Sequence, residues 1–350
     1  MSLHDVLVFI PVLGLLVFVH ELGHFLAAKW AGVRVERFSL GFPPRMIGKK
    51  IGDTDYCISW IPLGGYVKMA GMIDESMDSK IEGQPWEFMS KPVWKRAIII
   101  AAGPFMNVVL AIAFFAALHF HYGVPVPTNE PVVEQVITGS PAEGIGLQPD
   151  DRILAINGAS VGTWEDLTAL IHANPEKQIT IEWERNGEKL QALVTPRLDP
   201  QDQRGKIGIG PKVEIRAAGI GESFVLACAR SWWITREIGK FIGRLFSGKE
   251  SVREGLAGPV QIMKMAGQFA REGLAEIINF VALISLQLAL LNLFPVPALD
   301  GGHLLLLGIE KILRRPVSLR ARLVVQQIGM ALLLALMAFI VINDVQKLFR

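Results

Sequence analysis

Residues 6–30 have the sequence VLVFIPVLGLLVFVHELGHFLAAKW. A helix of this length and apolar character can cross a hydrocarbon core of roughly 30 Å, for which about 20 residues are needed. Apart from Lys29 at its end, three ionisable residues, His20, Glu21 and His24, interrupt it. An ionisable side chain at the centre of a spanning helix costs on the order of 2.5 to 3.5 kcal/mol. The stretch therefore predicts a membrane helix that carries a functional site.

The three residues follow the H-E-x-x-H pattern. On a helix, His20 and His24 project from one face and can hold a metal ion, while Glu21 can reach a metal-bound water. The simpler alternative is three polar residues that pack against other helices. Because the pattern lies inside a membrane span, we favour the metal site. We predict His20 and His24 as metal ligands and Glu21 as the catalytic carboxylate.

A zinc hydrolase needs a third protein ligand and an open fourth position for water. The candidate is Asp300, within the sequence NLFPVPALDGG of residues 292–302. Two prolines break the helix there, and the Gly-Gly pair allows close backbone approach. Broken helix in a membrane protein is tolerated where it is buried or lines a watery cavity. The alternative for Asp300 is a helix N-cap for residues 303–313.

The composition indicates a membrane protein, with 51% hydrophobic residues and a mean hydropathy of +0.38. The net charge of +2 comes with no long basic run, so we expect no nucleic-acid partner. Cys57 and Cys228 are far apart and are expected to be free thiols. Four stretches are apolar and long enough to span a bilayer: residues 6–30, 97–120, 277–293 and 323–342.

Basic residues are unevenly distributed around these spans. Lys91, Lys95 and Arg96 precede the second span, and Arg314, Arg315, Arg320 and Arg322 precede the fourth. The positive-inside rule places both loops in the cytoplasm. Both termini and the large central loop are then predicted on the other side. The first 30 residues lack the basic start and cleavage site of a secretory signal, so we expect them in the mature protein.

The central loop, residues 125–200, predicts a compact β-rich domain. It has short β-branched runs, Asn-Gly turn signals and a helix at 163–173 with Thr163 as N-cap. The run GSPAEGIGLQPDDRILAING of residues 139–158 resembles the bacterial PDZ signature, with Asp150 where glycine is usual. PDZ domains bind extended chain ends by strand addition. A domain that only blocks bulky substrates is the alternative.

Two other segments carry shorter signals. Residues 54–69 alternate strand-like residues with a turn at Gly64-Gly65, which predicts a β-hairpin whose free edge, including Tyr66, pairs with unwound substrate. A cytoplasmic hairpin without a substrate role is the alternative. Residues 223–246 place three basic residues at four-residue steps on one face, which predicts a helix on the bilayer surface. A helix packed on a neighbouring domain is the alternative.

Several motifs occur in the order found in one family. Besides H-E-L-G-H and L-D-G, they are IPLGGYVKM at 61–69, VWKR at 93–96, AGPFMN at 102–107 and LAGPV at 256–260. Over nearly its whole length the chain resembles the site-2 proteases, close to the bacterial regulator of sigma-E protease group. The resemblance implies that His20, His24 and Asp300 bind one catalytic Zn²⁺ and that Glu21 is the catalytic carboxylate. It also implies that Asn292 contacts the substrate backbone or the developing oxyanion, and that the hairpin dips into the membrane.

The expected fold is a polytopic α-helical membrane protein with about four transmembrane helices, a membrane-associated β-hairpin and one extracytoplasmic β-rich PDZ domain. We expect an N-terminal membrane core at 1–124, with the hairpin at about 54–69, and the PDZ domain at 125–200. These are followed by a linker with the amphipathic interfacial helix at 201–275 and by a C-terminal membrane core at 276–350. Larger family members often carry two PDZ domains, whereas this chain has room for one.

The resemblance implies an intramembrane zinc metalloprotease of the bacterial inner membrane, with its active site toward the cytoplasmic side. Its substrates would be transmembrane segments of single-pass proteins already cut by another protease, such as anti-sigma factors, or signal-peptide remnants. One alternative is a catalytically inactive scaffold that binds membrane segments, which would be expected to lack Glu21 or a ligand. Another is a transporter that relays protons, which predicts more spans and inverted repeats.

Overall fold

The computed structural model describes residues 2–72, 81–199, 203–248 and 258–348. The chain divides into two compact units, residues 1–120 together with 219–350, and residues 121–218. They are named here the membrane unit and the β-rich unit. The β-rich unit is longer than the predicted 125–200, because strands as far as Arg216 pair with strands near its start. Those strands are too short to give a periodic signal in the sequence.

Within the described residues, four helices are long and apolar enough to cross a membrane. They are α1 (Leu3–Trp30), α2 (Val93–Tyr122), α8 (Leu274–Asn292) and α10 (Leu319–Leu348). Most extend beyond the predicted spans by several residues, because helix ends depend on polar caps as well as on hydropathy. In α1 the Ser2 hydroxyl accepts a hydrogen bond from the Asp5 N–H and caps the first turn.

Helices α1 and α2 approach closely along the part of α1 that carries the H-E-x-x-H pattern. Gly23 permits this approach, because a Cβ there would overlap the carbonyl of Ala102. Ala28, Ile99 and Ile100 are almost fully buried in the core beside this contact. Small residues at a helix interface let backbones pack closely where lipid offers no hydrophobic driving force. A short 3-10 turn, η1 (Phe88–Ser90), precedes α2.

The hairpin of the membrane unit is larger than predicted. Strand β1 (Val35–Ile51) pairs antiparallel with β2 (Thr54–Met69), and the chain turns at Gly52-Asp53. The predicted turn at Gly64-Gly65 is wrong, because both residues lie inside β2. Gly52 has a φ of 60°, which suits a tight two-residue turn. Instead, Gly64 permits a close approach of the Phe42 ring, and Gly65 permits a close approach of the Ser39 carbonyl.

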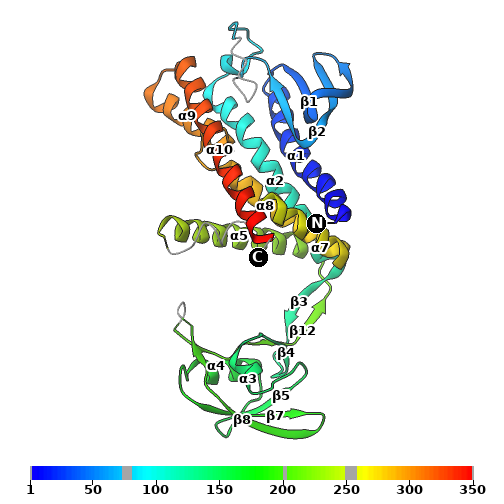
Figure 1. Ribbon diagram of the computed structural model, residues 1–350, viewed down its shortest axis with the longest axis vertical. Coiled ribbons are helices and arrows are strands. Elements are labelled where there is room, and N and C mark those ends of the chain that lie inside the picture. Colours follow the sequence, from blue (N-terminus) through cyan, green and yellow to red (C-terminus); the bar gives the residue numbers. More distant parts are fainter. Residues whose placement is uncertain (1, 73–80, 200–202, 249–257, 349–350) are drawn as a thin grey trace. The chain divides into compact units, whose positions relative to one another are not determined.

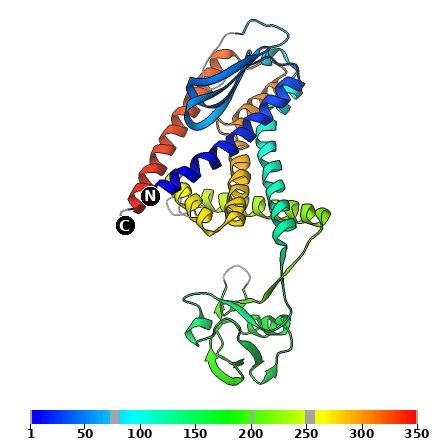
Figure 2. The same cartoon turned by 90° about the vertical axis from the view of Figure 1, so that its right-hand side faces the viewer.

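The hairpin lies beside α1 in both views (Figures 1 and 2). Phe38 of β1 contacts Phe18 and Phe25 of α1, with ring centroids 5.8 and 5.1 Å apart. A Cβ built on Gly65 of β2 would lie 3.5 Å from Cγ of Glu21. The aromatic packing therefore places the inner part of β2 directly beside the H-E-x-x-H residues.

The membrane unit also contains α5 (Ile220–Phe246), which runs crosswise to α2 and α8 (Figures 1 and 2). Arg230 of α5 lies over the ring of Phe115 in α2 at 4.4 Å and donates to Asn279 of α8 at 2.9 Å. Trp232 and Trp233 remain exposed. Helix α5 is thus packed against two spans, and its place on a bilayer surface stays a prediction.

Helix α7 (Pro259–Glu272) connects α1 and α10 through two buried acidic residues. Arg271 of α7 forms an ion pair with Asp5 at 2.9 Å. At the other end, the Gly258 and Gln261 N–H groups each donate to Asp344 of α10 at 3.2 Å. A carboxylate at a helix N-terminus is favourable, because it satisfies amides that have no partner within the helix.

Helix α9 (Asp300–Leu313) is joined to its neighbours by a second set of buried charges, the arginine cluster of Arg96, Glu310 and Arg322. Oε2 of Glu310 lies 3.0 Å from Nη1 of Arg96 in α2. Oε1 pairs with Arg322 in α10 and also accepts a hydrogen bond from the Val317 N–H at 2.8 Å. One carboxylate therefore links three helices.

The β-rich unit is built on a four-stranded antiparallel sheet with the order β6-β5-β7-β8. Its strands are β5 (Arg152–Ile156), β6 (Ala159–Ser160), β7 (Ile179–Arg185) and β8 (Glu188–Val194). Its apolar core also includes Ala142 of α3 (Pro141–Gly144) and Leu167 of α4 (Trp164–His172). The predicted cap of α4 is confirmed, because Thr163 Oγ1 accepts from the Asp166 N–H at 3.1 Å.

Shorter strands form three antiparallel pairs in the same unit. Strand β4 (Val133–Val136) pairs with β11 (Ile209–Pro211), and β9 (Arg197–Leu198) pairs with β10 (Gly205–Lys206). Strand β3 (Val124–Pro127) pairs with β12 (Val213–Arg216). The first and last strands of the unit are therefore neighbours.

The turn before β5 keeps a residue with a left-handed backbone conformation, although it is not the glycine that is usual in the bacterial PDZ signature. Asp150 stands there with a φ of 71°. The next residue, Asp151, is fully buried and accepts two hydrogen bonds of 2.7 Å from Arg185. This contact raises the pKa of Arg185 above its usual value, since it favours the charged guanidinium. The carboxylate of Asp151 thus ties the turn to β7.

Candidate metal centre

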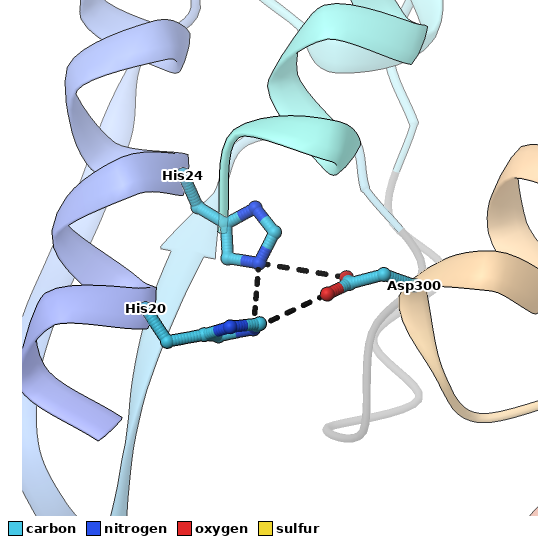
Figure 3. Close-up of side chains that lie close together, drawn as sticks. All are labelled: His20, His24 and Asp300. Atoms are coloured by element: carbon cyan, nitrogen blue, oxygen red, sulfur yellow. Dashed lines mark hydrogen bonds and ion pairs between the residues drawn. The ribbon is translucent and has the colours of Figure 1, made fainter. Parts of the chain in front are cut away.

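His20 and His24 lie one turn apart on α1, and both side chains are buried. Their Nε2 atoms are 3.1 Å apart (Figure 3). Residues four apart on a helix share a face, which explains why the two imidazoles converge. Their other ring nitrogens, the Nδ1 atoms, contact α2.

The third member, Asp300, is the first residue of α9 and faces both histidines (Figure 3). Its Oδ2 lies 3.2 Å from Nε2 of His20, and its Oδ1 lies 3.4 Å from Nε2 of His24. Leu299 holds the N-cap position, and no side chain bonds to the cap. The alternative role of Asp300 as an N-cap is therefore wrong.

The broken segment between α8 and α9 brings Asp300 to this position. Helix α8 ends at Asn292, and Ala298 adopts a φ of 73° before α9 begins. A Cβ on Gly301 would overlap the carbonyl of Phe294, and one on Gly302 would overlap that of Val296. Only glycines fit at both positions, so the Gly-Gly pair lets α9 begin against the preceding turn.

The donor atoms fit a zinc ion. Neighbouring ligand atoms of a tetrahedral zinc with bonds of 2.0 to 2.1 Å are about 3.3 Å apart. The three separations here are 3.1, 3.2 and 3.4 Å. Oδ2 of Asp300 is buried and has no well-directed hydrogen bond from the described part of the chain, which suits an atom that ligates a cation. One ligand atom from each of His20, His24 and Asp300 lies within 4.8 Å of the other two.

A cavity of about 290 Å³ opens onto this cluster. All eight residues predicted for the site line it: His20, Glu21, His24, Gly64, Gly65, Tyr66, Asn292 and Asp300. They come from α1, β2, the end of α8 and the start of α9. The cavity can therefore hold a peptide segment between the edge of β2 and the metal ligands.

Comparison with known proteins identifies the family. A family model described as "Peptidase family M50" matches residues 8–336. The chain belongs to peptidase family M50. The predicted relation to the site-2 proteases is confirmed, and so is the prediction of a metalloprotease with zinc as its cofactor.

Curated relatives of the M50 chain cover almost its full length. A zinc metalloprotease of Rhizobium meliloti is 38% identical over 97% of this chain and 96% of its own. The regulator of sigma-W protease RasP of Bacillus subtilis is 30% identical over the whole of both chains. Among solved structures, the PDZ domain of the SdrC-like protein of Listeria monocytogenes matches 25% of this chain and 93% of its own. That match has 21% identity and a TM-score of 0.22.

Helix α2 supplies a second layer of contacts around His20 and His24. Nδ1 of His24 donates to the carbonyl of Ile99 at 2.9 Å, which directs its Nε2 lone pair toward the cluster. Nδ1 of His20 lies 3.3 Å from Nδ2 of Asn107. Oδ1 of that buried amide has no hydrogen-bond partner within the described residues. A half-turn of the amide would let Oδ1 accept from His20 Nδ1–H, the proton position that zinc binding at Nε2 requires.

In the sequence, residues 102–107 of α2 stand out only as a family motif, and no role for them was predicted. Gly103 is necessary there, because a Cβ would overlap Nε2 of His24. His303 was also missed; it lines the cavity and lies one helical turn after Asp300. The available signal was its spacing of three residues from Asp300, which puts both on one face of α9.

Proposed function

We propose that this M50 protease cuts single-span membrane proteins within the bilayer. His20, His24 and Asp300 would hold the zinc ion, and Glu21 would act as the general base. The observation that carries the proposal is that Asp300, at the start of α9, converges with two buried histidines of α1, a helix apolar enough to span a membrane. A peptidase that cuts water-soluble substrates does not need an active site on a membrane-spanning helix.

The chain's own groups suffice for the proton transfers of peptide hydrolysis. When bound, zinc supplies a Lewis acid and lowers the pKa of its water toward about 7. Glu21 follows His20 on α1 and lines the same cavity. Its carboxylate takes a proton from the attacking water and returns it to the leaving amine. The second-layer contacts of Asn107 and Ile99 keep both imidazoles oriented while this occurs.

We propose that β2 holds the substrate backbone extended over the metal ligands. A helical segment hides its amides, so it must unwind before it can be cut. Gly64 and Gly65 line the cavity without side chains, which leaves room for a second backbone. Asn292, which lines the same cavity, would donate its amide N–H to the substrate backbone or the developing oxyanion.

The β-rich unit would be a PDZ domain that selects substrates. It would lie outside the cytoplasm, as would both termini, in a protein of the bacterial inner membrane. It either binds extended chain ends or excludes substrates with bulky domains, so a prior cut by another protease would be needed. Anti-sigma factors and signal-peptide remnants are the proposed substrate classes. A relative named as a sigma-W regulator supports the first class.

The test is cleavage of a model single-span substrate in detergent by the wild type and by Glu21→Gln, with bound zinc quantified in each. Glu237→Gln, on the exposed side of α5, is the matched control. We expect all three proteins to hold zinc and only Glu21→Gln to lose activity, by at least roughly a thousandfold. Equal cleavage by Glu21→Gln would refute its role. Zinc binding without any cleavage by the wild type would favour an inactive scaffold that binds membrane segments.

A further inference from the structure

Strands β3 and β12 form a two-stranded ribbon at the start and end of the β-rich unit (Figure 1). Strand β3 begins two positions after α2 ends, and β12 ends four positions before α5 begins. At roughly 3.3 Å per extended residue, chain connectivity alone keeps the ribbon within about 15 Å of the ends of both helices. The ribbon is therefore the first part of the β-rich unit beyond a span.

The register of the ribbon determines which backbone groups face outward. The Thr128 N–H donates to the Lys212 carbonyl at 2.7 Å, which makes these two residues a hydrogen-bonded pair. Alternate pairs of an antiparallel ladder are bonded. Val126 opposite Glu214 is thus a bonded pair, whereas Pro125 opposite Ile215 is a non-bonded pair. The backbone groups of non-bonded pairs point away from the partner strand.

The two outer edges of the ribbon differ in their ability to accept another strand. On β3 the outward positions are Pro125 and Pro127, which have no N–H to donate. Proline at outward positions is a common device that protects an edge strand from pairing. This edge of the ribbon is therefore blocked.

The edge of β12 lacks this protection. Its outward positions are Val213 and Ile215. The Val213 N–H already donates to Oε2 of Glu134 at 2.5 Å. The N–H and carbonyl of Ile215 and the carbonyl of Val213 point outward, and the Ile215 side chain is 65% exposed. An exposed apolar side chain beside outward amide groups is the pattern of a strand that accepts a partner.

We propose that the outer edge of β12 binds an extended segment of the substrate by strand addition. The segment is the stub that continues the substrate's membrane span toward the side of the β-rich unit. Alternating backbone donors and acceptors select another extended backbone and not a lipid headgroup. A single-span substrate presents such a backbone where its span leaves the bilayer, and β3 follows the end of the candidate span α2 after only two positions. This proposal rests on the proposed function.

The first test is Ile215→Pro, which removes the outward N–H and leaves the bonded pairs of the ribbon intact. Ile215→Thr is the matched control, because it shortens the side chain and keeps the N–H. One backbone hydrogen bond contributes about 0.5 to 1.5 kcal/mol. We expect Ile215→Pro to raise KM two- to tenfold for a substrate with the stub, with kcat unchanged. Ile215→Thr should stay within twofold, and a substrate without the stub should not distinguish the variants.

A second measurement reads the edge without cleavage. Ile215→Cys would be placed in a Glu21→Gln chain whose Cys57 and Cys228 are alanine, and single cysteines would be moved along the stub. Strand addition predicts disulfide yields that alternate with a period of two residues. Uniform yields, a covalent dimer of the protease, or an unchanged KM in Ile215→Pro would each overturn the proposal. Because cross-linking needs no catalysis, it decides the proposal even if the wild type fails to cut.

Discussion

The membrane unit contains two buried clusters of three polar residues, and they are satisfied in opposite ways. The metal cluster of His20, His24 and Asp300 directs lone pairs of all three residues to one point. The arginine cluster pairs the carboxylate of Glu310 with guanidinium groups on both sides. The first cluster contains no Lys or Arg, so its three ligand atoms are left to share a metal ion or a proton, whereas the second contains two guanidinium groups.

This difference shows when buried polar residues indicate a ligand. Burial costs free energy in both clusters, so burial alone does not separate a binding site from a structural contact. A set of acceptor atoms that converge on one point does distinguish a binding site from a structural contact. Helix α9 takes part in both clusters, with Asp300 in its first turn and Glu310 near its end. This helix thus carries a member of the candidate metal site at one end and buried ion pairs at the other.

The largest effect is expected for Asp300→Ala, which breaks the metal cluster only. Zinc should be lost and cleavage should fall by at least roughly a thousandfold, because two ligands hold zinc too weakly. Metal analysis and a cleavage assay in detergent measure the two quantities. Retention of one zinc ion per chain by Asp300→Ala would contradict the assignment.

Glu310→Gln is the reciprocal change in the arginine cluster. It leaves Arg96 and Arg322 buried without a negative partner, which should lower the free energy of unfolding by about 3 to 5 kcal/mol. Zinc affinity of the folded fraction should remain within tenfold of the wild type. Denaturant unfolding of the zinc-free protein and chelator competition give the two values. Loss of zinc at unchanged stability would show that the clusters are not independent.

Asn107→Ala sharpens the comparison within the metal cluster. The ligands remain, and only the amide beside Nδ1 of His20 is removed. We expect zinc affinity to fall 10- to 100-fold, as for other partners of metal-bound histidines. Chelator competition measures the loss, and Asn174→Ala in the β-rich unit, whose side-chain amide donates to the Leu170 carbonyl at 2.8 Å, is the control. An affinity within twofold of the wild type would exclude an orienting role.

The smallest effect is expected for a carboxylate that pairs with a cation at the solvent-exposed surface. Glu237 contacts Lys240 at 2.8 Å on the exposed side of α5. Its replacement in Glu237→Gln should shift the unfolding temperature by less than about 2 °C, because exposed ion pairs contribute little. A shift as large as that of Glu310→Gln would show that burial does not cause the difference between the two glutamates.

The sequence predicted features that depend on local spacing. The shared face of His20 and His24 follows from a four-residue step, and the spans follow from apolar runs. Asp300 was found through the prolines and glycines around it. These signals lie within a few residues of one another, so one helical turn or one break in a helix is enough to interpret them.

Features that join distant segments were not predictable in the same way. Arg96, Glu310 and Arg322 each resemble an ordinary charge next to a span, and only the packing of three helices brings them together. The Gly64-Gly65 pair was misassigned because glycine serves tight turns and close contacts equally well. The end of the β-rich unit was missed because β11 and β12 have no period of their own.

The wide separation of the proposed metal ligands along the chain sets an order of events during synthesis. His20 and His24 emerge from the ribosome well before Asp300 does. At roughly 5 to 20 residues per second, the interval is on the order of 15 to 60 seconds. Until then α1 can sit in the bilayer with two histidines and no third ligand. During that interval the nascent chain has no complete set of the proposed zinc ligands with which to cut a neighbouring protein.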